Sequence, residues 1–370
     1  MDAKPSLDLV RSLTDEHVLR ALMEHRRLTR AELAARTGIS KPTVSESVRR
    51  LCAAGLVADT GERTTGRGRA GSYYALAGDA GCALVVSVAP DGVVVEALDA
   101  YGDVVGRAAE DVVRPARPPQ VVAAVEAAVR AARRGGVRFR TAVVSAADPV
   151  DRATGRLVHL ADAPFLLGEL SLQEVLAGSV DGPVLVDNDV NWAARAERAA
   201  APGLDDFVYL YLGEGLGCAV VNDRVVRRGH SGLVGEIAHV PTVGPDGAVV
   251  PFTEVFGLLG LRRPGSTAID VDALRAAAGS AEGAAVLGPL ARAVAGVLAA
   301  AVAFADPELV VVGGPWGIEP AVLDAVVTEA GRLHRPVEVR AARVADRPEL
   351  AGARDQGLEN LRSLVVDACR

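Results

Sequence analysis

The sequence is poor in lysine, aromatic residues and cysteine. Only Lys4 and Lys41 are lysines, so nearly all of the positive charge is arginine, and no function follows from that bias. Aromatic residues make up 4% of the 370. The four cysteines show no Cys-x-Cys or Cys-x-x-Cys spacing, which argues against a zinc framework and favours reduced, buried thiols.

The composition is typical of an α/β protein with more than one unit. Half of the residues are apolar, and Ala, Val, Gly and Leu dominate, which suits helices packed on valine-rich strands. A length of 370 residues predicts two or three cooperating units. The N-terminus lacks a signal peptide's apolar core, and Asp, Arg or Pro interrupts the longest apolar stretches before they could span a bilayer. We therefore expect a cytoplasmic protein.

Positive charge is concentrated at the N-terminal end. Residues 1–76 hold 13 Lys and Arg against 9 Asp and Glu, a net charge of +4. The remaining 27 basic and 38 acidic residues give −11. Because phosphate neutralisation drives non-specific nucleic-acid binding, only the N-terminal unit is expected to be attracted to nucleic acid.

Residues 1–76 carry the signals of a helix-turn-helix. Apolar residues between positions 7 and 25 indicate one amphipathic helix or two short ones, at Leu9, Leu13, Val18, Leu22 and Met23. Thr29 and Glu32 form a capping box that opens a second helix through Arg36. Glycine at position 38 suits the left-handed backbone conformation that often ends such a helix.

A third helix has the surface of a recognition helix. Ser40 can cap it, and its inward face carries Val44, Val48 and Leu51 at i, i+4 and i+7. Small polar and basic side chains point elsewhere and suit contacts with base edges and phosphates: Lys41, Thr43, Ser45 and Arg49. An ordinary solvated helix face is the alternative interpretation.

A hairpin follows the third helix. Residues 54–57 end the helix and start a strand, and the tip over residues 64–69 has no apolar residue before the chain returns through residues 73–76. Such a wing can place Arg67 and Arg69 in a minor groove. Helix, turn, helix and wing in this order predict DNA binding by residues 1–76.

The pattern changes to strands and turns from residue 82. Strands over 82–89, 93–99 and from 104, a helix over 119–134, and strands over 141–146 and 183–186 give the order βββαβαβ, typical of half of an actin-like or hexokinase-like fold. A second hairpin set begins at residue 207, and a long Ala-rich helix covers 283–305. We expect two lobes around a cleft within 77–370: one over about 80–186, one over about 187–350, and a C-terminal helix over about 352–368.

Three motifs give this order a specific resemblance. Residues 187–197 begin Asp-Asn-Asp-Val-Asn, residues 229–239 read Gly-His-Ser-Gly-Leu-Val-Gly-Glu-Ile-Ala-His, and residues 306–314 read Asp-Pro-Glu-Leu-Val-Val-Val-Gly-Gly. Behind a winged helix-turn-helix, they resemble the ROK family of sugar-responsive repressors and sugar kinases. The resemblance covers essentially the whole chain. It implies a DNA-binding regulator, a repressor in particular, that binds operator DNA as a homodimer or homotetramer.

The resemblance also implies a sugar site. Asp189 matches the base of the kinases, at the carboxyl end of a strand where α/β folds bind ligands. Asn188, Glu236, His239 and Glu254 match positions that contact sugar hydroxyls. Each residue alone has a plainer interpretation: Asp189 as a helix cap, or Glu236 as a solvated loop acid. Because carboxylates repel a phosphate, a neutral sugar or oligosaccharide effector is favoured over a sugar phosphate.

The phosphate-binding turns depart from the family pattern. Where the kinases carry Asp-x-Gly-Gly-Thr, this chain reads Ser-Val-Ala-Pro-Asp over residues 87–91, which loses the acid and deletes one N–H at Pro90. The second turn has Glu214 in place of the usual Thr. We expect the carboxylates of Asp91 and Glu214 to repel ATP, so the domain is predicted to be no enzyme and to use no cofactor. An active ATP-dependent sugar kinase is the alternative.

Two more departures concern the sugar side. Many ROK proteins hold a zinc ion with three cysteines and the His that ends the motif at residues 229–239. In this chain residues 241–248 contain no thiol, so no metal is expected at His239. The absence of metal leaves the orientation of His239 and Glu254 open. Ala147-Asp148 stands where the family has Pro-Gly, so this loop is expected to be repositioned. The pocket would then either accept a larger or different ligand or no longer bind a sugar.

Overall fold

The computed structural model describes residues 7–65, 70–78, 80–133, 136–160, 166–280 and 283–369. Its N-terminal elements are α1 (Leu7–His25), β1 (Arg27–Thr29), α2 (Arg30–Thr37), α3 (Lys41–Ala53), β2 (Val57–Arg63) and β3 (Ser72–Leu76). The strands form one sheet in the order β1-β3-β2. The predicted winged helix-turn-helix is thereby confirmed.

The sequence signals of this unit act as predicted. Thr29 and Glu32 close a reciprocal capping box at the start of α2, and Gly38 ends that helix with φ of 70°. The Ser40 side chain accepts from the Thr43 N–H at the start of α3. Leu13 differs from expectation, since its side chain is 46% exposed. The buried face of α1 is instead formed nearer its end, by Val18, Leu19, Leu22 and Met23.

Two lobes with the same strand plan follow. The first contains β4 (Cys82–Ala89), β5 (Gly92–Leu98), β6 (Val104–Glu110), α4 (Pro118–Ala132), β7 (Phe139–Ala146), α5 (Leu172–Leu176) and β8 (Val184–Asn188). Its sheet has the order β6-β5-β4-β7-β8. Strands β4, β7 and β8 are parallel, and β5 and β6 continue as an antiparallel meander.

The second lobe repeats this plan. Its elements are α6 (Asp189–Ala200), β9 (Phe207–Leu212), β10 (Leu216–Asn222), β11 (Val225–Val226), β12 (Pro241–Val243), β13 (Val249–Pro251), α7 (Phe252–Leu258), α8 (Val271–Ala278), α9 (Gly283–Ala305), β14 (Leu309–Gly313), α10 (Pro320–Ala330) and β15 (Glu338–Ala341). The order β11-β10-β9-β14-β15 matches that of the first sheet strand for strand. The predicted two-lobed fold is confirmed.

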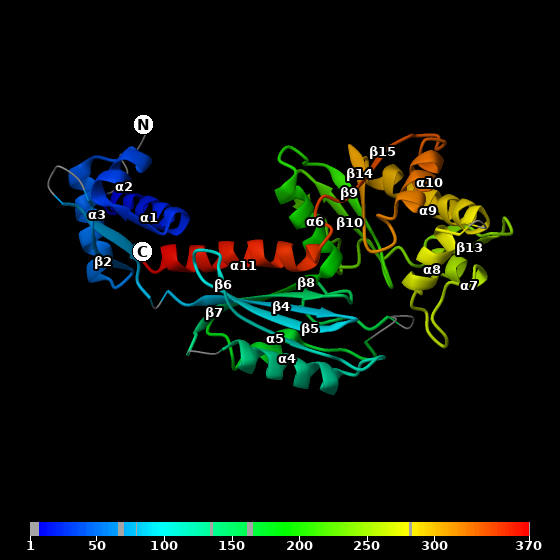
Figure 1. Cartoon of the computed structure of the whole chain (residues 1–370), viewed down its shortest axis with the longest axis horizontal. Coiled ribbons are helices and arrows are strands. Elements are labelled where there is room, and N and C mark those ends of the chain that lie inside the picture. Colours follow the sequence, from blue (N-terminus) through cyan, green and yellow to red (C-terminus); the bar gives the residue numbers. More distant parts are fainter. Residues whose placement is uncertain are drawn as a thin grey trace.

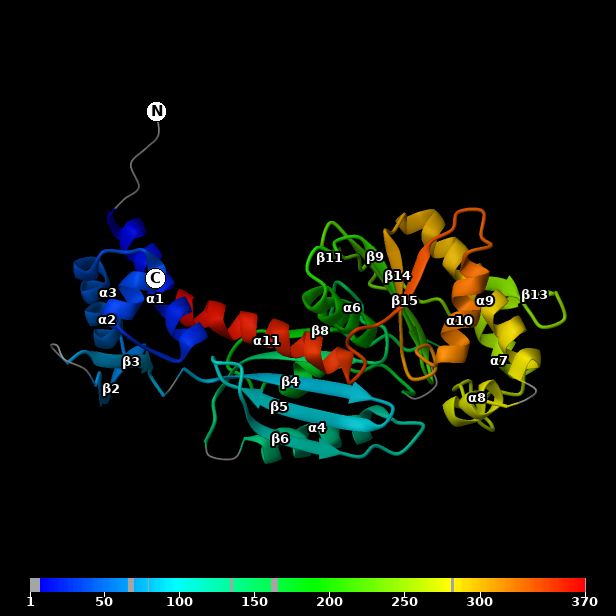
Figure 2. The same cartoon turned by 45° about the horizontal axis from the view of Figure 1, so that its top comes forward.

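The last helix, α11 (Pro348–Asp367), returns to the first lobe instead of extending the second. It packs on β4, β7 and α6, while α6 also contacts β9 and β10, so α6 and α11 form a layer between the two sheets (Figure 1). Alternate residues of β4 divide the packing: Leu84 and Val86 face the core under α4, whereas Ala83 and Val85 face α11. Figure 2 shows α11 running from the junction of the lobes to the N-terminal domain.

The end of α11 shares a hydrophobic core with α1. Leu361, Val365 and Val366 of α11 belong to the same buried cluster as Leu19 and Leu22 of α1. Polar contacts reinforce this joint between the winged domain and the first lobe. Arg26 donates twice to Asp103, both at 2.6 Å, and Arg362 donates to the backbone carbonyls of Ala100 and Met23.

One described helix, α9, is long and apolar enough to cross a membrane. Its residues Leu290, Val294 and Leu298 are buried in the core of the second lobe, and the helix packs against α10 and β12. Pro289 and Arg292 interrupt its apolar sequence. This packing is that of a core helix in an α/β lobe.

A buried ion pair ties α11 to the first sheet. Glu96 on β5 is fully buried and accepts two hydrogen bonds from Arg354, at 2.5 and 2.6 Å. Arg107 on β6 lies 3.4 Å from the same carboxylate, and its side chain is 54% exposed.

We predict that Arg354→Ala lowers the free energy of unfolding by about 3 kcal/mol, because it leaves the buried Glu96 carboxylate without its main partner. Urea denaturation followed by circular dichroism measures the loss. The control is Arg107→Ala, which removes a mostly solvated partner and is expected to cost less than about 1 kcal/mol. Equal losses for the two variants would contradict this account of α11 docking.

Candidate functional site

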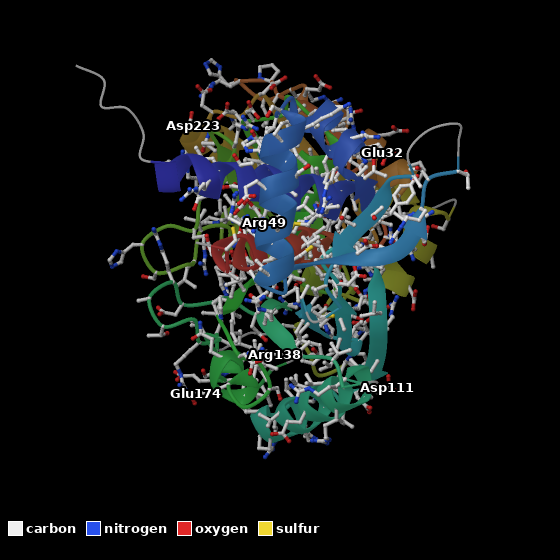
Figure 3. All side chains as sticks on the ribbon, turned by 90° about the vertical axis from the view of Figure 1, so that its left-hand side faces the viewer. Glu32, Arg49, Asp111, Arg138, Glu174 and Asp223 are labelled. Carbon is white, nitrogen blue, oxygen red and sulfur yellow. The ribbon has the colours of Figure 1, made fainter. Side chains whose placement is uncertain are left out.

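The outer surface of α3 carries the predicted recognition residues. Lys41, Thr43 and Arg49 are exposed and Ser45 is half-buried, while Val44, Val48 and Leu51 face inward. Figure 3 shows Arg49 on α3 at the end of the molecule remote from the second lobe. The Arg49 side chain is 73% exposed and donates to Glu46 at 2.6 and 3.1 Å. Arg49 must leave Glu46, wholly or in part, to contact a phosphate.

A buried polar cluster holds α3 against α1. Asp15 of α1 is 6% exposed and accepts from Ser47 at 2.5 Å and from Arg50 at 2.6 and 3.2 Å. Nothing in the sequence pattern identified these residues, although an acid among the apolar positions of α1 is a weak signal. The cluster fixes the angle at which the outer face of α3 is presented.

The wing lies beside α3. Strands β2 and β3 pair antiparallel, as the hairpin pattern predicted. Arg67 and Arg69 at its tip lie outside the described residues. Within the described part, Arg27 forms an ion pair with Glu62 and stacks over the Tyr73 ring, so these contacts tie β1 to both strands of the wing.

A cavity of about 450 Å³ lies where the two lobes meet. It is large enough for a small organic ligand. Asn188, Asp189, Glu236 and His239 line it, so four of the five residues predicted to bind a ligand share one cavity. Glu254 does not line it: the Glu254 side chain is half-exposed and pairs with Arg262 at 3.1 Å.

The turn from β8 to α6 places the first two of these residues. The Asn188 side chain caps α6 by accepting from the Val190 N–H at 3.0 Å, and its amide donates weakly to the carbonyls of Ala146 and Asp148. Asp189 is the first residue of α6 and also accepts from the Val190 N–H, at 2.8 Å. The amide of Asn188 therefore joins α6 to the loop after β7.

Glu236 enters the cavity from the loop between β11 and β12, which contains the motif of residues 229–239 and is called the signature loop below. Gly235 precedes it with φ of 98°, and a Cβ at this glycine would overlap the carbonyl oxygen of Cys218 on β10. Only glycine permits this approach of loop and strand. The Gly235-Glu236 pair thus places a carboxylate against the second sheet.

Three carboxyl groups in the cavity titrate near neutrality. Burial, followed by the charges of Glu349, Asp148 and Glu236, raises the pKa of Asp189 to about 8. Burial and Glu236 raise the pKa of Asp148 to about 7, and burial raises the pKa of Glu236 to about 7. The sequence flagged Asp148 only as a loop departure and did not identify it as a site residue.

The side of the cavity that corresponds to the phosphate turns is occupied by ion pairs. Glu214, in the turn between β9 and β10, accepts from Arg114 of the first lobe and from Arg263 of the second, both at 2.6 Å. The Gly213 N–H in the same turn donates to the Gly215 carbonyl. The expectation that Glu214 simply repels ATP was incomplete, because two arginines balance the charge of Glu214 and connect the two lobes.

The start of α11 contributes to the same side, which the sequence did not indicate. Arg347, Pro348 and Glu349 line the cavity. Arg347 lies 3.7 Å from the Asp91 carboxylate and donates to Glu349 at 3.3 Å. Asp91 follows Pro90 in the turn after β4, so the first phosphate turn is also joined to an arginine.

The loop that replaces the family's zinc loop forms the hairpin β12–β13, with Thr242 paired to Val250. Among the described residues, no group of three or more His, Cys, Asp or Glu is arranged to hold a metal ion. The absence of zinc remains a prediction, to be checked by metal analysis of the purified protein.

Comparison with known proteins gives two family matches. The model of the ROK family matches residues 95–253, and the model described as winged helix-turn-helix DNA-binding matches residues 11–58. A solved structure described as a ROK family transcriptional regulator, homologue of the E. coli MLC protein, superposes with a TM-score of 0.63 at 17% identity. It covers 96% of this chain and 99% of that chain.

Curated relatives include enzymes and a regulator. A glucokinase from Streptomyces coelicolor is 31% identical over 135 residues, which cover 36% of this chain and 41% of the enzyme. The xylose repressor of Caldicellulosiruptor bescii is 21% identical over 243 residues, 62% of this chain and 59% of the repressor. The alignments with these relatives and with a bifunctional NanE/NanK enzyme of Brucella melitensis cover between about a third and three fifths of the relatives' own lengths.

We predict that Glu214→Gln lowers the free energy of unfolding by about 1–2 kcal/mol, because Arg114 and Arg263 are left facing one another without a charged acceptor. Urea denaturation at low salt measures the loss, which should shrink at 0.5 M salt. The control, Glu126→Gln on α4, removes an exposed i,i+4 pair and should change the free energy by less than about 0.5 kcal/mol. A Glu214 effect no larger than that control would show that the bridge does not hold the lobes.

Proposed function

The chain belongs to the ROK family and carries a winged helix-turn-helix in front of its ROK domain, and on that premise we propose that it is a transcriptional repressor controlled by a sugar or sugar-derived ligand. A DNA-binding regulator is the function that its domains support. The observation that carries the proposal is the joint between those domains, because α11 connects the cavity with the DNA-binding domain.

The outer face of α3 supports operator recognition. Lys41, Ser45 and Arg49 lie at i, i+4 and i+8, so they share one side of the helix. A helix presented in this way enters the major groove in helix-turn-helix proteins. We propose that Lys41 and Arg49 contact phosphates, that Thr43 and Ser45 reach base edges, and that Arg67 and Arg69 approach the minor groove.

We propose that α11 couples ligand to DNA binding. Its first residues line the cavity, and its last turns share a core with α1. Gly352 lets the helix pack directly against α6, because a Cβ there would overlap the carbonyl oxygen of Trp192. A ligand that favours one arrangement of the lobes would therefore move α6 and α11 together and change how the two DNA-binding domains of an oligomer are spaced.

We further propose a cytoplasmic homodimer or homotetramer bound to a pseudo-palindromic operator, since helix-turn-helix dimers read two half-sites. Val243 and Val249, cross-strand partners in the β12–β13 hairpin, are 41% and 74% exposed. Paired exposed valines of this kind favour a contact with a second copy. Sedimentation of the wild type and of Val249→Asp tests the oligomer.

An active sugar kinase is the second candidate, favoured by the glucokinase match. Three features of the cavity argue against phosphoryl transfer. Pro90 has no N–H to offer a phosphate, Glu214 and its arginines occupy the second turn, and the family's magnesium-positioning acid is replaced by the buried Ser87.

We predict that Lys41→Ala and Arg49→Ala each weaken binding to the protein's own promoter region and reduce the slope of log affinity against log salt by about one. Fluorescence anisotropy across a salt series measures both effects. Arg130→Ala, an equally exposed arginine on α4, is the matched control and should leave binding unchanged.

Removal of residues 1–76 should abolish the specific gel shift altogether. Because this deletion uncovers Leu361 and Val365 on α11, the truncated protein must first be shown to remain monodisperse. Specific binding by a monodisperse 77–370 fragment would overturn the assignment of DNA binding to the winged domain.

We predict no measurable binding of ATP with magnesium in calorimetry, and no phosphorylation of hexoses above background. The double variant Pro90→Gly with Glu214→Thr restores an N–H and removes a carboxylate, so it should gain affinity for ATP if the turns are the obstacle. Micromolar binding by the wild type, together with turnover of a sugar, would establish the kinase in place of the regulator.

A further inference from the structure

Asp148 is a buried acid at the wall of the cavity, with no counter-charge among the described residues. It follows β7, its side chain is 2% exposed, and its Oδ2 has no hydrogen-bond partner among the described residues. The amide of Asn188 approaches its backbone carbonyl at 3.3 Å, which holds the residue in place. A buried carboxylate oxygen that faces a cavity and lacks a partner in the protein requires a partner from outside it.

Two more acids face the same space. Asp189 enters from α6 and Glu236 from the signature loop. Among the described residues, no cation acts on either carboxyl group. The arginines that line the cavity are committed elsewhere: Arg114 to Glu214, and Arg347 to Asp91 and Glu349. The acids are close enough that Glu236 raises the pKa of Asp148, and both raise that of Asp189.

The acids on the two sides of the cavity therefore differ in their partners. On the side that corresponds to the phosphate turns, arginines neutralise the acids. On the opposite side lie the three acids Asp148, Asp189 and Glu236, each from a different element. A neutral polyol could satisfy their hydrogen bonds only while the carboxyls stay largely protonated, because it offers no charge to compensate the ionisation of adjacent buried carboxyls. A metal ion does not fit, because no metal-binding group of these acids is formed within the described residues. An ammonium group on a hydroxylated ligand meets both requirements.

We propose that the ligand of this cavity is a cationic sugar derivative, an amino sugar with a free amine, whose ammonium group binds Asp148 while Asp189 and Glu236 complete its surroundings. This rests on the proposed function and deepens it, since it names the chemical class of the effector. The hydroxyl groups of the ligand would then contact Asn188 and His239, which line the same cavity.

Binding of such a ligand should release protons. At pH 6 the three acids are largely protonated, and an arriving ammonium lowers their pKa values, so protons leave on binding and affinity rises between pH 6 and pH 7.5. Other charged or titratable groups face the acids from every side: His239 from the signature loop, Tyr211 from β9, Cys218 from β10, Arg347 and Glu349 at the start of α11, and Asp91, Arg114 and Glu214 across the cavity. Burial raises the pKa values of Tyr211 and Cys218, so both stay neutral in this range. The two arginines stay charged throughout this range.

The experiment uses the full chain and matched pairs of sugars. Isothermal calorimetry is performed with glucosamine, galactosamine and mannosamine, each against its parent hexose and its N-acetylated form, at pH 6 and pH 7.5 and in two buffers of different ionisation enthalpy. We expect at least one amine to bind about tenfold or more tightly than its parent and N-acetyl forms, with proton release. Asp148→Asn should abolish most of that preference while its affinity for the parent hexose changes less than about threefold.

Asp223→Asn is the charge-matched control, because it removes one negative charge at an 86% exposed site outside the cavity, labelled in Figure 3. It should retain the amine preference. Equal or tighter binding of the uncharged sugars, an unchanged preference in Asp148→Asn, or binding of none of the probes would overturn the proposal. Operator binding is measured on the same samples without sugar, so failure of the DNA-binding function is seen separately from failure of the amine preference.

Discussion

The packing of α11 into the space between the two sheets is the constraint on which the rest of the molecule depends. The helix closes one face of the first sheet, packs along α6, begins at the cavity and ends in a core shared with α1. Its charge contact with the fully buried Glu96 fixes its rotation as well as its position. Through this helix the geometry of the cavity is tied to that of the DNA-binding domain.

The two sides of the cavity differ in how their acids are paired. The strand order of the two lobes and the motif glycines bring acids and turns from both lobes to this one cavity. On one side, Glu214 accepts from two arginines, and Arg347 lies beside Asp91. On the other side, Asp148 and Glu236 have no counter-charge among the described residues.

Much of the fold could be predicted from local signals. The capping box at Thr29, the left-handed Gly38 and the apolar spacing of α3 are governed by residues within one or two turns of each other, and the structure contains each of them. The hairpin repeats similarly predicted both lobes. Four of the five residues predicted to bind a ligand line the cavity, because they follow strands or motif glycines.

The parts of the fold and of the site that the sequence did not predict depend on contacts between residues far apart in the chain. Arg114 and Glu214 are separated by 100 positions and Glu96 and Arg354 by 258, and no periodicity encodes such pairs. The return of α11 to the first lobe, the burial of Asp148 and the pairing of Glu254 with Arg262 are decided by tertiary packing. Leu13 is exposed because α2, α3 and β3 of the same domain, together with α11, pack on the other side of α1.

The position of α11 in the chain has a consequence for biosynthesis. All strands of the first sheet leave the ribosome before α6 begins, but the helix that covers one face of that sheet is made only after residue 347. At translation rates of about 5 to 20 residues per second, Val85 and Val143 stay without their cover for roughly 10 to 50 seconds. The first lobe is thus left unfinished while the whole second lobe is being made, and a nascent chain needs protection from aggregation during that interval.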